Sequence, residues 1–178
     1  MRILATLAAT VVVFAAFAAA VSASPKDDVL AAIKKANAAG SWDFVSVNKM
    51  GKESGLVEPP GYAYGKVEGG PSTLITGGKQ YINYNDGHGF VETRYTGTMS
   101  ILYIVPPAYG ALATDAITLV GWKPLPSGKP AKMYRIATPH GTLELYVGND
   151  GYPYRLVTPE GTVDYSNFGR TVRKVLPK

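Results

Sequence analysis

The last third of the sequence consists of strand-like segments that follow one another with very short gaps. The segments are rich in β-branched and aromatic residues, and turns of the type Thr-Pro-x-Gly-Thr or Asn-Asp-Gly separate them. Gaps of this length leave no room for a crossover helix, so neighbouring segments must pair as antiparallel hairpins. The sequence therefore predicts an antiparallel meander with strands over residues 132–138, 142–148, 152–158, 161–167 and 170–176.

The sequence before this meander contains segments of the same kind. Loops are expected at GKESGLVEPPG (51–61) and LPSGKP (125–130), where glycine, proline and charged residues accumulate. The other segments carry alternating, β-branched or aromatic residues, which favour strands. We predict strands over residues 42–50, 62–68, 72–76, 79–85 and 90–96.

One amphipathic helix is predicted over residues 24–40. Ser24 is a suitable N-cap, and Gly40 is a residue that commonly ends a helix. Lys34 and Lys35 are expected to face away from the apolar stripe of this helix. The stripe itself consists of Val29, Ala32, Ile33 and Ala36.

The apolar segment 99–122 shows no clean strand alternation, and its part PAYGALATDAITLV (107–120) predicts one short helix or two helical turns. A long antiparallel sheet with so few helices must curl and cover its inner face, or leave that face open for a ligand. The predicted fold class is therefore α+β: a strongly curved antiparallel sheet, an incomplete barrel, with an N-terminal helix and a short helical lid. The two helical segments either fill the curl or cover an apolar cavity.

The N-terminal residues 1–23 have the layout of a secretory signal peptide, because Arg2 precedes a long apolar run that ends in small residues. Cleavage after Ala23 leaves residues 24–178 as a single domain. An uncleaved transmembrane anchor is the alternative, since the apolar run is long. The chain contains no cysteine to carry a lipid anchor, so we expect a periplasmic or secreted protein.

Two Asn-Asp-Gly loops, at 85–87 and 149–151, are the segments that most resemble a site of chemistry. Each lies between strand-like segments, where Asn-Gly and Asp-Gly favour tight hairpin turns. A calcium loop needs more oxygen ligands than either loop supplies. His88 and His140 precede glycines in turns, and the sequence contains no nucleophile elbow, zinc-protease motif, phosphate loop or dinucleotide motif. We predict turns, no metal, no cofactor and no enzymatic activity.

The charge of the chain is mildly basic, with 18 Lys and Arg against 13 Asp and Glu. This weak and scattered excess does not indicate nucleic-acid binding. We interpret the densest basic cluster as a charged edge strand, with transient contact to an anionic membrane surface as the alternative. The cluster lies at the C-terminus and consists of Arg170, Arg173, Lys174 and Lys178.

Two stretches carry a resemblance to a known family: STLITGGKQYINYNDG (72–87) and LELYVGNDGYPYRLVTPEGTVDYSNFGRTVRKVLP (143–177). With the preceding helix, they resemble the periplasmic lipoprotein-carrier superfamily, which includes the LolA and LolB carriers and the mycobacterial LppX and LprG lipid-binding proteins. The resemblance implies a curved half-barrel with a helical lid and non-covalent binding of acyl chains. In LolA an arginine helps to hold the lid, and Arg94 is the candidate for that role here.

The resemblance and the apolar strands together favour an exported, non-enzymatic binder of a lipid or lipoprotein acyl chain, without cofactor or metal. A cell-envelope protein-interaction module with a filled core is the alternative, and a hydrolase is the third hypothesis. Each candidate residue also suits a packed core, because interiors use the same side chains. The predicted cavity-wall or lid residues are Phe44, Leu74, Ile82, Tyr84, Ile101, Ile104, Leu119, Trp122, Leu145 and Leu156.

Overall fold

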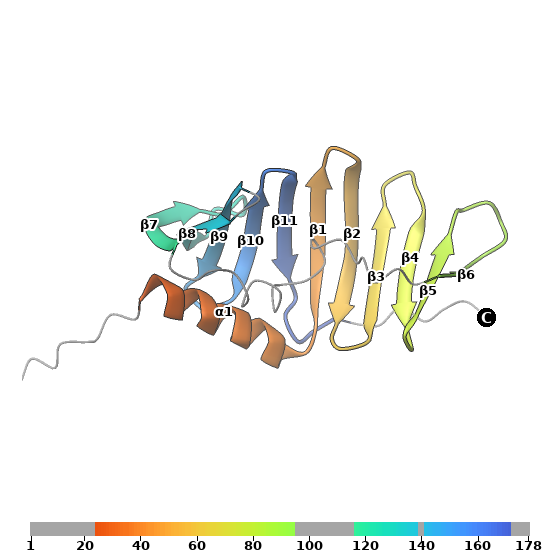
Figure 1. Cartoon of the computed structure of the whole chain (residues 1–178), viewed down its shortest axis with the longest axis horizontal. Helices are drawn as coiled ribbons and strands as arrows, with labels where there is room; N and C mark the ends of the chain where they lie inside the picture. The colour runs from red at the N-terminus through yellow and green to blue at the C-terminus, as the bar shows by residue number, and fades with distance from the viewer. Residues whose placement is uncertain (1–23, 95–115, 139–140, 172–178) are drawn as a thin grey trace, which may run out of the picture.

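The computed structural model describes residues 24–94, 116–138 and 141–171, which form one helix and one eleven-stranded antiparallel sheet (Figure 1). The strand order is β6-β5-β4-β3-β2-β1-β11-β10-β9-β8-β7, so the first and last described strands of the chain meet in the middle of the sheet. The predicted α+β fold with a curved, open antiparallel sheet is confirmed. The elements are α1 (Pro25–Ala39), β1 (Trp42–Asn48), β2 (Gly51–Glu58), β3 (Tyr62–Val67), β4 (Ser72–Thr76), β5 (Lys79–Asn83), β6 (Val91–Thr93), β7 (Ile117–Pro124), β8 (Pro130–Thr138), β9 (Gly141–Gly148), β10 (Pro153–Thr158) and β11 (Gly161–Ser166).

Helix α1 begins and ends where its capping residues predict. The Ser24 hydroxyl accepts a hydrogen bond from the Asp27 backbone N–H over 3.2 Å, and the Asp27 carboxylate accepts one from the Ser24 N–H. This reciprocal arrangement satisfies two donors that the first turn leaves without helical partners. Gly40 ends the helix with a left-handed φ of 75°. The predicted apolar stripe is buried against the sheet.

The face of the sheet on which α1 packs is called the inner face here. Figure 1 shows α1 running across the half of the sheet that holds β7 to β11, while β2 to β6 extend beyond it. The register places Phe44 of β1 opposite Tyr165 of β11, and Tyr134 of β8 opposite Leu145 of β9. Directly opposed residues share a face, so these four side chains join the α1 stripe in one core.

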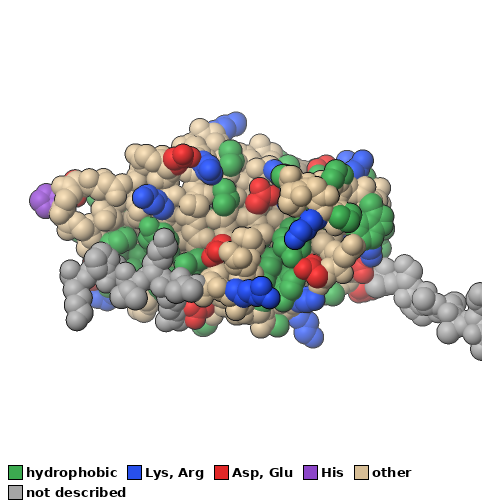
Figure 2. Space-filling model, turned by 180° about the vertical axis from the view of Figure 1, so that it is seen from behind, with side chains coloured by type: hydrophobic (Ala, Val, Ile, Leu, Met, Phe, Trp, Pro, Cys, Tyr) green, Lys and Arg blue, Asp and Glu red, His purple; other side chains and the backbone are tan. Residues whose placement is uncertain are grey.

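The other face, called the outer face here, is more polar. Figure 2 views the molecule from behind and shows Lys, Arg, Asp and Glu side chains scattered among hydrophobic ones. Arg135 pairs with Glu144 at 3.5 Å and Arg155 with Asp164 at 3.4 Å, in both cases across neighbouring strands. A smaller hydrophobic cluster lies on the same face around Leu56, Tyr62 and Leu74.

The prediction of a loop over 51–61 is wrong for residues 51–58, which form β2. This segment lacks an apolar alternation because Gly55 lies where no side chain fits. A Cβ at Gly55 would lie 1.9 Å from the Tyr64 carbonyl oxygen and 2.8 Å from the Phe44 ring. Hydrogen bonding to β1 on one side and β3 on the other forms the strand despite this weak local preference.

The predicted helix over 107–120 is wrong for its last four residues, 117–120, which belong to β7. The sequence of this strand lacks the usual alternation of inward and outward side chains, because a bulge at Val120 shifts the register between Leu119 and Gly121. The rest of the predicted lid, with Ile101 and Ile104, lies outside the described residues. Of the predicted strand 170–176, the first two residues are not in a strand, and the remainder lies outside the described residues together with most of the basic cluster.

Candidate functional site

A cavity of about 310 Å³ opens between α1 and the strands β7, β8 and β9, and it is called the α1 cleft here. Helix α1 packs against β7 and β9, which brings these elements together although they are far apart in the sequence. The residues that line the cleft are Asp28, Ala31, Ala32, Lys35, Trp122, Lys132, Tyr134, Val147, Gly148, Asn149 and Gly151.

The apolar side of the cleft depends on the irregular geometry of β7. Because of the bulge at Val120, Leu119 pairs with Tyr134 and Trp122 pairs with Lys132. Tyr134 and Lys132 are two residues apart and share a face, so Leu119 and Trp122 both lie on the inner face although they are three residues apart. Trp122 remains 55% exposed and Leu119 47% exposed. The sheet thus presents two large apolar side chains beside the helix.

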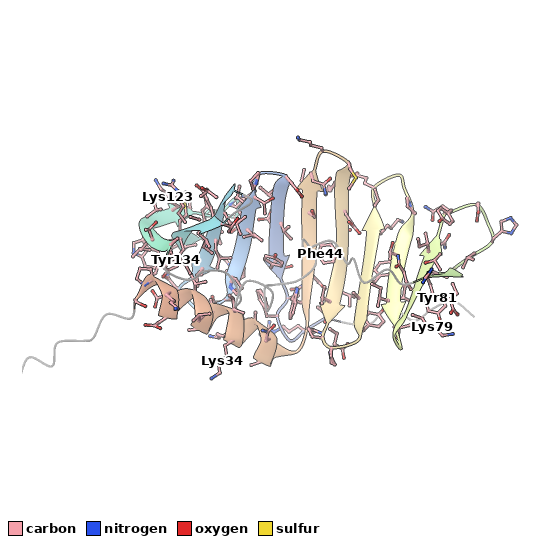
Figure 3. All side chains as sticks on the ribbon, in the orientation of Figure 1. Lys34, Phe44, Lys79, Tyr81, Lys123 and Tyr134 are labelled. Atoms are coloured by element: carbon pink, nitrogen blue, oxygen red, sulfur yellow. The ribbon has the colours of Figure 1, made fainter. Side chains whose placement is uncertain are left out.

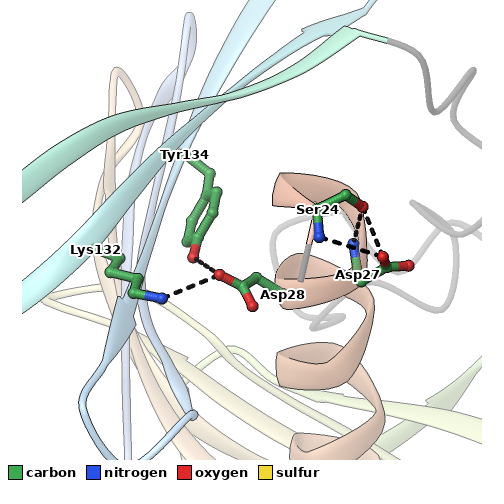
Figure 4. A network of polar contacts seen from close by, with 5 residues as sticks. All are labelled: Ser24, Asp27, Asp28, Lys132 and Tyr134. Carbon is green, nitrogen blue, oxygen red and sulfur yellow. Dashed lines mark hydrogen bonds and ion pairs between the residues drawn. The ribbon is translucent and has the colours of Figure 1, made fainter. Parts of the chain in front are cut away.

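The polar side of the cleft is a network around Asp28, in the first turn of α1 (Figure 4). The carboxylate accepts a hydrogen bond from the Tyr134 hydroxyl over 2.5 Å. It also forms an ion pair and a hydrogen bond with Lys132 Nζ over 3.1 Å. The hydrogen bond from Tyr134 is the main reason that the pKa of Asp28 lies below its ordinary value. Burial, followed by the hydrogen bond to Asp28, raises the pKa of Tyr134. The network ties the beginning of the helix to β8.

A second polar contact ties the C-terminal half of α1 to the turn between β9 and β10. Lys35 Nζ donates a hydrogen bond to the backbone carbonyl of Asp150 and lies 4.6 Å from the centre of the Tyr152 ring. This turn is the second Asn-Asp-Gly segment, in which Gly151 has a φ of 77° and donates its N–H to the Gly148 carbonyl. The prediction that this segment is a turn is confirmed, and the structure adds that it holds the helix.

Aromatic stacking braces the same turn. The Tyr152 and Phe168 rings stack with centres 4.5 Å apart, and Tyr154 meets Phe168 edge-on at 5.8 Å. The Tyr154 hydroxyl donates to the Asp150 carboxylate over 2.6 Å, and burial together with this bond raises the pKa of Tyr154 to about 12. A second cavity of about 320 Å³ lies beside the turn, lined by Leu125, Lys129, Pro130, Gly148, Asn149, Asp150 and Tyr154.

The first Asn-Asp-Gly segment is also a turn. Asn85 adopts a left-handed φ of 60°, and the Asp86 carboxylate accepts a hydrogen bond from the His88 backbone N–H at 3.0 Å. His88 is exposed, and His140 lies outside the described residues. Across the described ranges, no three His, Asp or Glu side chains gather in a way that could hold a metal ion. Within the same ranges, no helix has the length and hydrophobicity to cross a membrane.

The predicted wall residues fall into several environments. Phe44, Leu145 and Leu156 are fully buried in the inner-face core, and Figure 3 shows Phe44 near the middle of the sheet. Ile82 lies on the inner face of β5 and is half-buried. Leu119 and Trp122 lie on the inner face of β7, and only Trp122 lines the α1 cleft.

Three other residues that the sequence predicts for the cavity or its lid lie apart from the α1 cleft. Leu74 is buried on the outer face, where it packs with Leu56 and Tyr62. Tyr84 follows β5 in a loop and is exposed. Arg94, expected on a mid-sheet strand, instead comes one residue after β6, the outermost described strand on its side.

Sequence reasoning missed the charged residues of the cleft. Lys35 was expected to face away from the apolar stripe, but it lines the cleft, whereas Lys34 points away from the sheet (Figure 3). Asp28 and Lys132 look like ordinary surface charges in the sequence. The signal that could have found them is the alternation of β8, which places Lys132 on the same face as the buried Tyr134 and Ile136.

Comparison with known proteins identifies the fold. No family model matches the chain, and no curated protein matches it. Among solved structures, LprF from Mycobacterium bovis matches with a TM-score of 0.59 and 15% sequence identity, over 86% of this chain and 96% of that chain. LprF belongs to the LppX/LprG family. The predicted resemblance to the lipoprotein-carrier superfamily is therefore confirmed as a likeness of fold.

Proposed function

We propose that this protein is an exported, non-enzymatic binder of a lipid or lipoprotein acyl chain, and that the chain lies in the α1 cleft. The observation that carries the proposal is Trp122, a large apolar side chain that lines the cavity and is more than half exposed. Small-molecule sites are typically concave and lined by apolar and aromatic side chains together with a limited set of polar groups that orient the ligand. The fold shared with LprF supports the proposal.

The size of the cleft favours a single chain. A volume of about 310 Å³ lies at the lower end of the range for ligand cavities, which is roughly 300–1,000 Å³. Each methylene group that leaves water contributes about 0.8 kcal/mol, so burying about ten of them contributes on the order of 8 kcal/mol. Covering Trp122 and Leu119 adds to this gain, because both side chains are now in contact with water.

The proposal is tested by native mass spectrometry and organic extraction of the protein recovered from a bacterial periplasm, followed by titration with a fluorescent fatty acid. We expect co-purified lipid and uptake of the probe, and Trp122→Glu should abolish both. Val47→Glu is the control, because Val47 is 49% exposed but lies on the outer face. A clean unliganded mass with no uptake by the unaltered protein would contradict the proposal.

A protein-interaction module is the second candidate, and one observation favours it. Strand β7 is the outermost described strand on its side of the sheet, and it exposes Val120 in addition to Leu119 and Trp122. An apolar edge strand can pair with a strand of another protein. If Trp122→Glu removes a co-purifying protein while the unaltered protein carries no lipid, this second function replaces the first.

A further inference from the structure

The charges that line the α1 cleft do not balance. Its charged side chains, within the described part of the chain, are Lys35, Lys132 and Asp28. Two ammonium groups and one carboxylate leave the cleft with a net positive charge near neutral pH. An apolar cavity with an excess of positive charge fits a ligand that has both a hydrocarbon chain and a negative group.

Among the residues that the structure describes, Lys35 contacts a backbone carbonyl and an aromatic ring and forms no ion pair. Its ammonium donates to the carbonyl oxygen of Asp150 and lies over the Tyr152 ring. An ammonium group has three donors, so Lys35 can donate a hydrogen bond to a ligand oxygen and keep its contact with the turn. The side-chain carboxylate of Asp150 accepts a hydrogen bond from the Tyr154 hydroxyl, and both residues line the second cavity.

Lys132 forms an ion pair with Asp28, but the Asp28 carboxylate also has a second hydrogen-bond donor. Asp28 accepts hydrogen bonds from both Tyr134 and Lys132, so its carboxylate keeps the Tyr134 bond when Lys132 turns toward a ligand. The Lys132 side chain is 39% exposed, which leaves its ammonium accessible. Lys132 also pairs across the strands with Trp122, which places a positive group beside the exposed ring.

We propose that the α1 cleft selects a single-chain amphiphile with an anionic head group, a carboxylate or a phosphate ester, over a neutral lipid with the same chain. The head group lies between Lys35 and Lys132, and the chain covers Trp122 and Leu119. This inference rests on the proposed function, because it assumes that an acyl chain enters the cleft. It adds the chemical class of the ligand and the two residues that select it.

The test compares ligands that differ only in the head group, at a pH at which the acid is ionised. A fluorescent long-chain fatty acid, its methyl ester and a lysophosphatidic acid as competitor are titrated at low salt. We expect the acid to bind roughly tenfold more tightly than the ester, since hydrogen bonds to charged groups are the strong ones. The double variant Lys35→Gln/Lys132→Gln should lose this preference and keep its affinity for the ester.

The control variant is Lys34→Gln, which removes a neighbouring positive charge that does not line the cleft. It should leave the preference for the acid unchanged, whereas a loss of preference would show that overall charge, and not the cleft, attracts the probe. Unchanged affinity for the ester in the double variant shows that the cleft is intact, so a failure to fold is recognised separately.

The remaining outcomes separate the two proposals. Equal binding of acid and ester by the unaltered protein would overturn the head-group inference and leave the proposed function intact. Binding of neither probe would overturn the proposed function itself. Strong competition by lysophosphatidic acid would support the inference and indicate a phosphate head group. Displacement of the acid by inorganic phosphate alone would overturn it, because the chain would then not be required.

Discussion

The Tyr134 hydroxyl donates a hydrogen bond to the Asp28 carboxylate over 2.5 Å and thereby joins the first turn of α1 to the middle of β8. The two residues are separated by 106 positions in the sequence. Tyr134 is fully buried, and its ring packs in the inner-face core while its hydroxyl reaches the α1 cleft. One side chain therefore belongs both to the core and to the candidate site.

Replacing Tyr134 with phenylalanine should destabilise the protein. Removal of the hydroxyl leaves Lys132 as the side-chain partner of the Asp28 carboxylate among the described residues. A hydrogen bond to a charged group is worth about 1.5–3 kcal/mol. We expect the free energy of unfolding, measured in urea, to fall by about that amount. Tyr146→Phe is the control, because its hydroxyl lies 3.4 Å from Glu144 on the outer face, and its loss should cost less than about 0.5 kcal/mol. Equal effects would contradict the special role of Tyr134.

Asp28 should make stability depend on pH in the acid range. Its pKa in the folded protein lies below the ordinary value of 3.8, chiefly because Tyr134 donates a hydrogen bond to the charged form. The stability that this carboxylate contributes is complete above its unfolded-state pKa and is lost as pH falls through the folded-state value. The difference in free energy of unfolding between the unaltered protein and Asp28→Asn should therefore shrink as the solution is made more acidic than about pH 4.

Asp164 should show the opposite trend, which makes it an internal comparison. Burial raises the pKa of Asp164 above 3.8, and the nearby Arg155 only partly offsets this. The unaltered protein should therefore lose stability relative to Asp164→Asn as pH rises through the raised pKa. Urea unfolding of both variants across the acid range measures the two trends. Slopes of the same sign for Asp28 and Asp164 would contradict the electrostatic account of at least one of them.

Gly55→Ala should be strongly destabilising, because the new Cβ would meet the Tyr64 carbonyl oxygen at 1.9 Å and the Phe44 ring at 2.8 Å. Overpacking of a core costs typically 1–3 kcal/mol, and the backbone oxygen has little room to move, so we expect about 3 kcal/mol or more. Gly61→Ala is the control, since nothing lies within 4 Å of a Cβ there. The free energies of unfolding of both variants, measured in urea, decide the point. A mild effect of Gly55→Ala would mean that β2 and β3 separate easily.

The same glycine explains why part of the fold could not be predicted from the sequence. The meander could be predicted from the lengths of the gaps between strands, and α1 from its capping residues Ser24 and Gly40, because these signals are local in the sequence. Strand β2 has no local signal, since Gly55 is required by the Phe44 ring of another strand. The sequence predicts a helix at the beginning of β7 because the bulge at Val120 disrupts the alternation of a strand.

The candidate site was harder to predict than the fold, for a related reason. Trp122 could be chosen from its chemistry, because a large apolar side chain suits a cavity wall. Lys132 and Asp28 are 104 positions apart, and only the packing of α1 on the sheet brings their charges together. Lys35 likewise acquires its role from a turn more than a hundred residues away. Periodicity reports which face a residue occupies, but not which distant element lies against that face.

Leu145 and Leu119 should separate a core residue from a ligand-binding residue, although both were predicted as cavity wall. Leu145 is 1% exposed in the inner-face core, so Leu145→Ala should cost about 2–5 kcal/mol in free energy of unfolding. Leu119 is largely exposed beside the α1 cleft, so Leu119→Ala should change stability by less than about 0.5 kcal/mol.

The affinity for a fluorescent fatty acid should depend on Leu119 although stability does not. The acyl chain is proposed to cover this side chain, and truncating it to alanine removes about three carbon groups of contact, which at about 0.8 kcal/mol each corresponds to a loss of roughly 2 kcal/mol in binding. Urea unfolding and probe titration of the same preparations give both quantities. If Leu119→Ala lowers stability as much as Leu145→Ala, then β7 is part of the core. If it changes neither stability nor affinity, the chain does not lie along β7, and the ligand path must be sought elsewhere on the inner face.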